Sequence, residues 1–304
     1  MTPSSSSLPT GSTGLAVAGL LLNAFVWGVS WWPFRQLESQ GLHPLWSTAL
    51  IYAVAVVCVL CWRPRAWQGL WQFPALWLLM LASGLTNVGF NWAVTTGDVV
   101  RVVLLFYLMP AWSVLMAWPV LGERPSRGSL LRLLLALAGV VIVLKSPDSP
   151  WPLPQSLSDW LALAGGVFFA ATNVLLRKLG GTPSEARMMA MFGGGALMGS
   201  LAGLLGMAAG VVSAPALAAA GWPVALALCA AFLLSNWGLQ YGAARLAAHT
   251  TALIMLTELL FASVSSAWLD AAEFSTRTLV GGALIVFAAL LAALGPDSDK
   301  PADK

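Results

Sequence analysis

Long stretches without a single charged residue constrain the fold of this chain more than any other feature. Residues 66–97, 102–122 and 188–244 contain no Asp, Glu, Lys or Arg. A helix needs about 20 mostly apolar residues to cross the roughly 30 Å hydrocarbon layer of a bilayer. Each stretch is therefore long enough for one membrane span, and the third is long enough for two.

The composition agrees with a membrane protein. Hydrophobic residues make up 59% of the 304 residues and charged residues only 9%, whereas soluble domains carry roughly 25% charged residues. One globule of this size cannot hide so many apolar side chains in its core. We therefore exclude a water-soluble globular protein and expect the lipid bilayer to be a partner. The 15 basic residues form no basic stripe, so we expect no nucleic-acid partner.

Cutting the chain at Pro, Gly and charged clusters predicts an all-α integral membrane protein with ten transmembrane helices. The predicted ranges are 15–33, 44–62, 74–96, 99–121, 128–145, 157–179, 186–209, 223–245, 249–269 and 276–294. With both termini cytoplasmic, eleven Lys and Arg residues lie inside and four outside, as the positive-inside rule requires. We therefore predict a multi-pass protein of a bacterial-type cytoplasmic (inner) membrane. Residues 1–14 and 295–304 are predicted to be polar, disordered tails.

The sequence repeats itself at two offsets. An offset of 149 residues matches the pairs Thr86/Ser235, Asn87/Asn236, Gly89/Gly238, Asn91/Gln240 and Trp92/Tyr241. An offset of 142 residues matches Trp27/Phe169 and Ser30/Thr172. We therefore predict two repeats of five helices, residues 15–145 and 157–294. Because five is odd, the second repeat enters the membrane with the opposite orientation, as in many secondary transporters.

Polar side chains near the middle of two predicted helices indicate a substrate site. Asn87 and Asn91 share one helix face, and so do Asn236 and Gln240. A buried amide needs partners, so these faces look into protein or into a water-filled cavity. Such amides can bind the amino and carboxylate groups of a zwitterion. The alternative is hydrogen bonding between helices, worth about 0.6 kcal/mol on average.

The aromatic residues form two groups, one near the ends of the predicted helices and one deeper within them. Most tryptophans lie near the ends of predicted helices, where they anchor a protein at the membrane interface. A cavity lined by the deeper rings suits aromatic or bulky apolar metabolites, and the alternative is packing between helices or against lipid. The complete set of predicted substrate-binding residues is Trp27, Ser30, Thr86, Asn87, Asn91, Tyr107, Trp112, Thr172, Asn173, Ser235, Asn236, Trp237, Gln240 and Tyr241.

Glu258 is the only acidic residue well inside a predicted helix. An ionisable residue within the membrane is a functional hypothesis by default. A carboxyl at this depth could load and release a proton, and proton-coupled antiport would use that step. The alternative is a structural carboxyl that is hydrogen-bonded to Thr257, Ser263 or a backbone amide.

Enzymatic chemistry has little support in the sequence. The only histidines are His43 and His249, and no metal-binding motif, catalytic triad or phosphate-binding loop is present. We therefore expect no enzyme, cofactor or metal, although a membrane enzyme and a passive channel remain alternatives. Gly195, Gly199 and Gly203 recur every four residues, which predicts close helix packing within a monomer rather than a dimer interface.

The chain also resembles a known family. The segment WGVSWWPFRQL closes the first predicted helix, and MPAWSVLMAWPVLGERPSRGSLLRLLLALAGVVIVL covers the fourth and fifth. These segments are similar to the EamA-type drug/metabolite transporter (DMT) superfamily. Members of that family carry a Pro in the fourth helix and Gly-Glu at the following turn, which Pro110, Gly122 and Glu123 match.

The second copy of this pattern is more diverged. It keeps Glu258 and Glu273 but has Leu259 where family members often have Pro. The resemblance covers residues 15–294 and, within the family, is to the YddG-like exporters of amino acids. It implies a cavity between the first, third, fourth, sixth, eighth and ninth predicted helices.

Together these features predict a secondary transporter that exports small organic metabolites by alternating access. Amino acids with aromatic or other bulky neutral side chains are the expected substrates, and a multidrug or other metabolite exporter of the same superfamily is the alternative.

Overall fold

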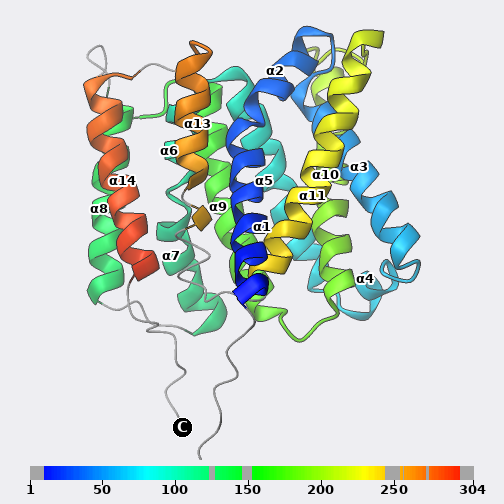
Figure 1. The fold of residues 1–304 in the computed structure, drawn as a ribbon, viewed down its shortest axis with the longest axis horizontal. Coiled ribbons are helices and arrows are strands. Elements are labelled where there is room, and N and C mark those ends of the chain that lie inside the picture. The colour runs from blue at the N-terminus through cyan, green and yellow to red at the C-terminus, as the bar shows by residue number, and fades with distance from the viewer. Residues whose placement is uncertain are drawn as a thin grey trace, which may run out of the picture.

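The computed structural model describes residues 10–122, 127–145, 153–243, 254–255, 257–271 and 274–294, and in this part of the chain the regular elements are all helices. The fold is therefore all-helical, as predicted. Most helices run along one common direction and form a bundle, in which α1 begins and α14 ends at the same end (Figure 1).

The helices follow the apolar segments of the sequence. Up to residue 145 they are α1 (Thr10–Val29), α2 (Trp31–Ser39), α3 (Pro44–Trp62), α4 (Gln68–Gln72), α5 (Leu76–Thr96), α6 (Val99–Phe106), α7 (Met109–Leu121) and α8 (Arg127–Leu144). From residue 153 they are α9 (Leu157–Lys178), α10 (Ser184–Ala208), the 3-10 helix η1 (Ala219–Gly221), α11 (Trp222–Ala243), α13 (Thr257–Trp268) and α14 (Thr276–Leu294).

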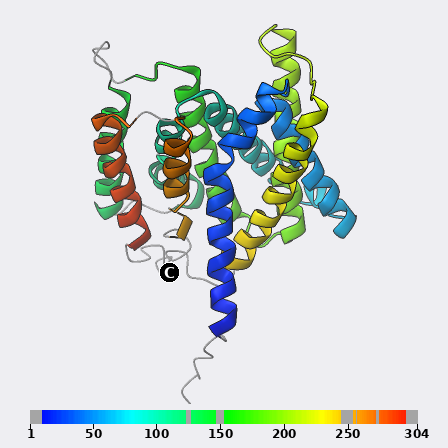
Figure 2. The same ribbon diagram turned by 45° about the horizontal axis from the view of Figure 1, so that its top comes forward.

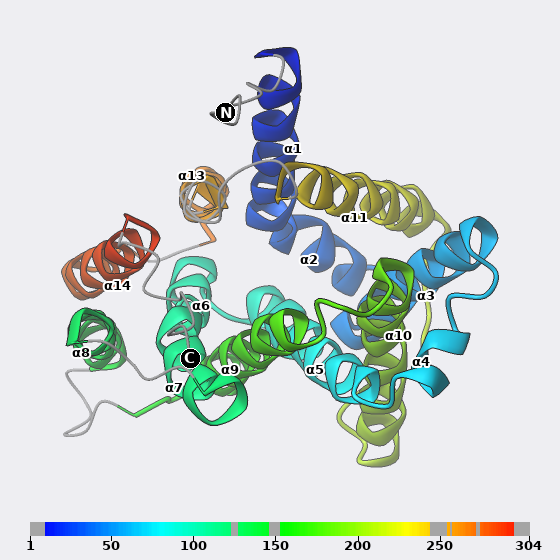
Figure 3. The ribbon, with the colours of Figure 1, turned by 90° about the horizontal axis from the view of Figure 1, so that it is seen from below.

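Six segments of the described chain are long and apolar enough to cross a membrane. They are Gly14–Ser39, Pro44–Trp62, Val99–Leu121, Leu157–Lys178, Ser184–Ala208 and Ala219–Leu239. The apolar parts of α8 and α14 are shorter, Leu130–Leu144 and Thr276–Ala288. Seen along the bundle, α8 and α14 pair at one edge and α3, α4 and α10 lie at the opposite edge (Figure 3).

Two of the predicted helices are broken, which the sequence analysis did not anticipate. The predicted range 15–33 is two helices, and α2 continues to Ser39 at an angle to α1 (Figure 2). The predicted range 99–121 is likewise divided into α6 and α7. Both α1 and α6 end four residues before a proline, Pro33 and Pro110. Proline has no N–H to bond the carbonyl four residues earlier, so the helix ends there.

Helix α6 lies at the centre of the fold. Every residue of α6 except Arg101 is buried. The helix begins at Asp98, whose carboxylate accepts a hydrogen bond from the Arg101 amide at 2.7 Å and so caps the first turn. The main hydrophobic core surrounds α6 and includes Phe90 and Ala262.

The close helix crossings at glycines include one between α11 and α1, one between α5 and α9, and one between α8 and α14. A Cβ added to Gly238 of α11 would lie 2.6 Å from the Gly19 carbonyl oxygen of α1. A Cβ on Gly89 of α5 would lie 2.9 Å from the Leu161 carbonyl oxygen of α9. The third crossing joins α8 and α14, where a Cβ on Gly139 or Gly281 would lie 2.6 Å from the other residue's carbonyl oxygen. Only glycine fits where backbones approach this closely.

The predicted glycine face of α10 packs against α3 of the same chain. Gly195 lies against the Tyr52 ring, Gly199 against the backbone of α3, and Gly203 against the Trp46 ring. The spacing of these glycines is therefore used for packing between two helices of one chain.

Candidate substrate site

Aromatic rings from five helices meet near the centre of the bundle. The Trp27 ring of α1 lies edge-on to Phe232 of α11 and to Phe90 of α5, with centroid distances of 4.8 and 5.8 Å. Phe90 in turn lies 4.6 Å from Phe106 of α6, which lies 5.4 Å from Phe169 of α9. We call these five rings the aromatic layer. It can hold a flat or bulky apolar group by ring contacts.

A buried carboxyl and a buried phenol lie next to this layer. Tyr107 occupies the break between α6 and α7, directly after Phe106. Its hydroxyl lies 3.1 Å from Oε2 of Glu258 and 3.2 Å from the Met255 carbonyl oxygen. Tyr107 is 4% exposed and Glu258 is 8% exposed. The α6 break therefore brings a hydrogen-bond donor from the first half of the chain to the acidic residue of the second half.

The two amides of α5 bind hydrogen-bonding partners on nearby helices. The Asn87 oxygen accepts a hydrogen bond from the Tyr52 hydroxyl of α3, and its nitrogen donates to the Ser83 carbonyl at 2.7 Å. The Asn91 nitrogen donates to the Thr48 hydroxyl of α3 at 3.0 Å. These contacts are the hydrogen bonds between helices that the sequence analysis gave as the alternative. The Asn91 oxygen is buried and has no hydrogen-bonding partner among the described residues.

Four predicted hydroxyl residues are satisfied within their own helices. Ser30, Thr86, Thr172 and Ser235 are each at most 6% exposed. Each donates to a carbonyl oxygen three or four residues earlier, at 2.9 to 3.1 Å. Such hydroxyls keep lone pairs that can accept a hydrogen bond, but they have no donor left to offer.

The remaining predicted residues lie in different environments. Trp112 packs against the same core as Trp27, and its Nε1 is buried without a hydrogen-bonding partner within the described ranges. Asn173, Asn236 and Tyr241 are partly buried. Trp237 is 63% exposed and its ring lies 5.7 Å from that of Tyr241, so it occupies an outer face of α11 rather than the aromatic layer. The side chain of Gln240, and all of Glu123, His249 and Glu273, lie outside the described residues.

Tyr52 and the four phenylalanines of the aromatic layer are not among the predicted site residues. Repeated polar pairs and deep Trp and Tyr side chains select the predicted set, and phenylalanines within apolar helices carry no such signal. Tyr52 carries a signal of its own, because it is a phenol within an otherwise apolar predicted helix, 44–62. Its ring lies 6.4 Å from Phe232 and thus joins Asn87 to the aromatic layer.

One end of the bundle is closed by hydrogen bonds between helices. Arg101 of α6 forms a two-point ion pair with Asp159 of α9, at 2.8 and 2.9 Å. Arg35 of α2 donates to the Thr95 carbonyl oxygen at 2.9 Å and to that of Gly97. We call this the Arg101 end of the bundle.

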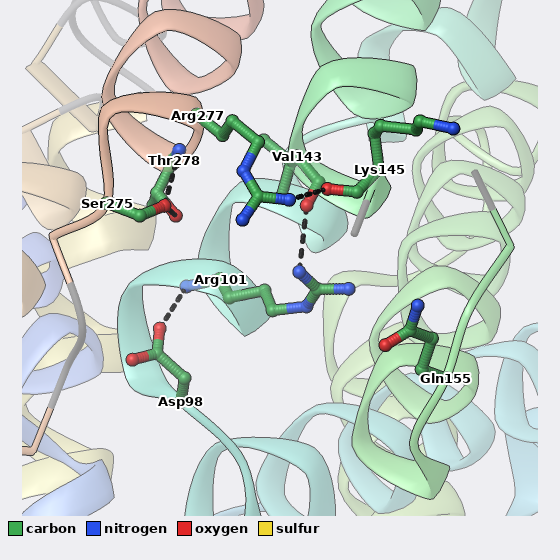
Figure 4. A pocket seen from close by; sticks show the side chains of 8 residues that line it. All are labelled: Asp98, Arg101, Val143, Lys145, Gln155, Ser275, Arg277 and Thr278. Carbon is green, nitrogen blue, oxygen red and sulfur yellow. Dashed lines mark hydrogen bonds between the residues drawn. The ribbon is translucent and has the colours of Figure 1, made fainter. Parts of the chain in front are cut away.

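A polar pocket of about 170 Å³ lies at the Arg101 end, away from the aromatic layer. Figure 4 shows Arg101 and Arg277 directed at the carbonyls that end α8, those of Val143 and Lys145. Cationic donors at a helix C-terminus satisfy its unpaired carbonyls and its dipole. Arg101 and Arg277 therefore bind the C-terminal end of α8 to α6 and α14.

Metal binding finds no support in the part of the chain that the structure describes. No group of three or more His, Cys, Asp or Glu side chains there is arranged to hold a metal ion.

Comparisons with known proteins find a similarity to one family model in the first part of the sequence and a similarity in fold to solved structures. Residues 14–145 match the model of the EamA-like transporter family. No protein with a curated description matches the chain. Among solved structures, 14 chains match. One, described only as "Crystal structure of protein", is 18% identical, covers 94% of this chain and 97% of its own, and superposes with a TM-score of 0.55. At this identity the likeness concerns the fold alone.

Proposed function

We propose that the chain is an EamA-like membrane transporter of the drug/metabolite transporter superfamily and that it exports small organic metabolites by proton-coupled alternating access. The match of residues 14–145 to the EamA-like family model supports this proposal. The proposed substrates are amino acids with aromatic or other bulky neutral side chains, as the YddG-like exporters handle. The proposed location is a bacterial-type inner membrane, with both termini in the cytoplasm and a monomer as the working unit.

The contact between Tyr107 and Glu258 carries this proposal. It buries a carboxyl in an apolar environment, directly beside the aromatic layer and between helices of the two halves. A carboxyl can change its charge by taking or losing a proton, and its hydroxyl partner can support either state. Proton loading at Glu258 can thus be linked to substrate binding at the neighbouring rings.

The helix crossings support two inverted repeats of five helices. Gly89 and Gly238 are matched at the offset of 149, and the residues they meet, Leu161 and Gly19, are 142 apart, the second offset of the repeat. A two-fold relation between the halves would therefore exchange the α5–α9 crossing with the α1–α11 crossing. The third crossing, between α8 and α14, would map onto itself. Inverted repeats are expected to be related by such an axis in the membrane plane.

Closure of the Arg101 end supports alternating access. The Arg101 end is held by the Arg101–Asp159 pair and by a hydrogen bond from Trp31 of α2 to Ser265 of α13, at 3.0 Å. A transporter that opens one end at a time keeps its other end closed in each of its two states.

Counterflow in proteoliposomes tests the proposal. Vesicles loaded with unlabelled L-phenylalanine should accumulate labelled L-phenylalanine in a saturable way, which a passive channel does not do. An imposed pH gradient should accelerate flux by the natural protein. Glu258→Gln should retain counterflow but lose the acceleration, because the amide cannot exchange a proton.

Two outcomes would contradict the proposal. An equal response of Glu258→Gln to the pH gradient would exclude coupling through this carboxyl. Counterflow of amphipathic drugs without counterflow of any amino acid would instead assign the alternative, multidrug export. Chemical conversion of the solute, detected by mass spectrometry, would point to a membrane enzyme.

A further inference from the structure

The amide of Asn23 is buried in the middle of α1. Asn23 is 1% exposed, and in the part of the chain that the structure describes neither its Oδ1 nor its Nδ2 has a hydrogen-bonding partner. Among the described residues, Gln40, Asn91 and Trp112 also contain a buried polar atom without a partner. Asn23 is the one amide of this set in which both the donor and the acceptor are unused.

The neighbours of Asn23 locate it next to the aromatic layer. Gly19, one turn earlier, contacts the backbone of Gly238 on α11. Trp27, one turn later, contacts Phe232 on the same helix and Phe90 on α5. Residues four apart lie on one helix face. Asn23 therefore lies on the same face of α1 as Gly19 and Trp27, between the crossing with α11 and the aromatic layer.

Burying an unpaired amide costs free energy, so the presence of Asn23 at this position needs a physical explanation. Transferring an amide out of water without a replacement hydrogen bond is costly, and nearly all buried polar groups in native proteins are paired. A leucine of similar size would avoid this cost at a position in contact with apolar neighbours. The cost is removed when a bound molecule supplies the missing donor and acceptor.

We propose that Asn23 is a polar anchor of the substrate site, and that its amide binds the α-ammonium and α-carboxylate groups of an amino acid. Oδ1 accepts a hydrogen bond from the ammonium group, and Nδ2 donates to the carboxylate. Both groups of an amino acid are attached to one carbon atom, as a single amide requires. The side chain of the substrate then contacts Trp27. This assignment rests on the proposed function for the substrate class, but concerns a residue outside the repeated polar pairs.

A three-ligand comparison tests the anchor. Binding of L-phenylalanine, phenethylamine and 3-phenylpropanoate is measured on the purified full chain, natural and Asn23→Leu. The two analogues each lack one of the groups that Asn23 is proposed to bind. The natural protein should prefer phenylalanine over both. Asn23→Leu should weaken phenylalanine binding at least tenfold and reduce the preference to about threefold or less, since a site built for hydrogen bonds discriminates by them.

The binding results distinguish a failure of the Asn23 anchor from a failure of the proposed function. Unchanged phenylalanine affinity and preference in Asn23→Leu would overturn the anchor and leave the proposed function standing. Failure of the natural protein to bind any amino acid would overturn the proposed substrate and, with it, the ligand assigned to Asn23.

Thermal stability without ligand gives an independent measurement. Replacing an unpaired buried amide by leucine should raise the melting temperature of Asn23→Leu in detergent, by about 2 °C or more. Asn87→Leu is the matched control, because both groups of the Asn87 amide are already paired. This second variant should lower the melting temperature. A comparable decrease for Asn23→Leu would mean that the amide is paired within the protein, and would overturn the anchor.

Discussion

Helices α5 and α11 carry matched sequences in the two halves of the chain but differ in their surroundings. Val88 and Trp237 are equivalent at the offset of 149, yet Val88 is 8% exposed and Trp237 is 63% exposed. Two residues away, Thr86 and Ser235 are both buried. The difference is thus local to one face, where Val88 packs with Leu45 and Val212. A repeated sequence specifies similar helices, but each copy packs according to its neighbours.

The largest effect is expected at the two glycine crossings, and it tests the two-fold relation between the halves. Gly89→Ala and Gly238→Ala should each prevent folding or lower stability by more than about 3 kcal/mol, because the new methyl group meets a backbone carbonyl that cannot move aside. Melting temperature and the yield of monodisperse protein provide the measurement. Gly181→Ala is the control, since a Cβ at Gly181 has no atom within 4 Å. Tolerance at one crossing but not at the other would speak against the two-fold relation.

At the Arg101 end, the ion pair between Arg101 and Asp159 joins the two halves of the chain. Asp159→Asn removes one partner of the Arg101 ion pair and should destabilise the protein by about 2–3 kcal/mol, because the Asp159 side chain is only 3% exposed. It should also make a cysteine introduced at Gln155 more reactive to a water-soluble thiol reagent. Reactivity equal to that of the same cysteine in the natural background would show that the pair does not close this end.

A smaller effect is expected when the Tyr107 hydroxyl is removed, and it distinguishes the role of Tyr107 from that of Glu258. Glu258 comes from the second half and Tyr107 from the first, and Tyr107→Phe removes only the hydroxyl. We expect roughly tenfold slower pH-driven flux, since a hydrogen bond to a charged group contributes about 1.5–3 kcal/mol. Counterflow without a pH gradient should change less. Equal loss in both assays would assign Tyr107 to substrate binding rather than to proton transfer.

The smallest effect returns to the equivalent positions of α5 and α11. Val88→Ala should cost about 1 kcal/mol of stability because it leaves a cavity in a packed core. Trp237→Leu should change stability by less than about 0.5 kcal/mol, because exposed positions rarely contribute more. Thermal unfolding in one detergent compares the two. A greater loss for Trp237→Leu would indicate that α11 packs against a partner at this face.

Much of the helical fold could be predicted from the sequence, because apolar length and charge-free stretches report directly on membrane spans. The helix α3, Pro44–Trp62, occupies the predicted range 44–62. The breaks before Pro33 and Pro110 were missed even though proline's missing N–H gives a rule for their position. A stretch long enough to cross the bilayer in one piece predicts an unbroken helix, because hydropathy is not sensitive to a break.

The site could be predicted only in part, because hydrogen-bond partners depend on tertiary packing. Asn87 and Asn91 were identified by their repetition, but the sequence gives no indication that Tyr52 and Thr48 of α3 would bind them. Asn23 was missed because it has no polar counterpart in the second half, where Gly165 occupies the position 142 residues later.

The proline breaks have a mechanical consequence. The α1 break follows Trp27 by three residues, and the α6 break follows Phe106 directly, so two rings of the aromatic layer lie at the depth of the breaks. If the segments on either side tilt, displacement is smallest at the fulcrum and grows toward the membrane surfaces. A molecule held by these rings would therefore stay nearly still while the ends of the helices move around it. With such a tilt, the level of the two prolines would be the part of the protein that moves least.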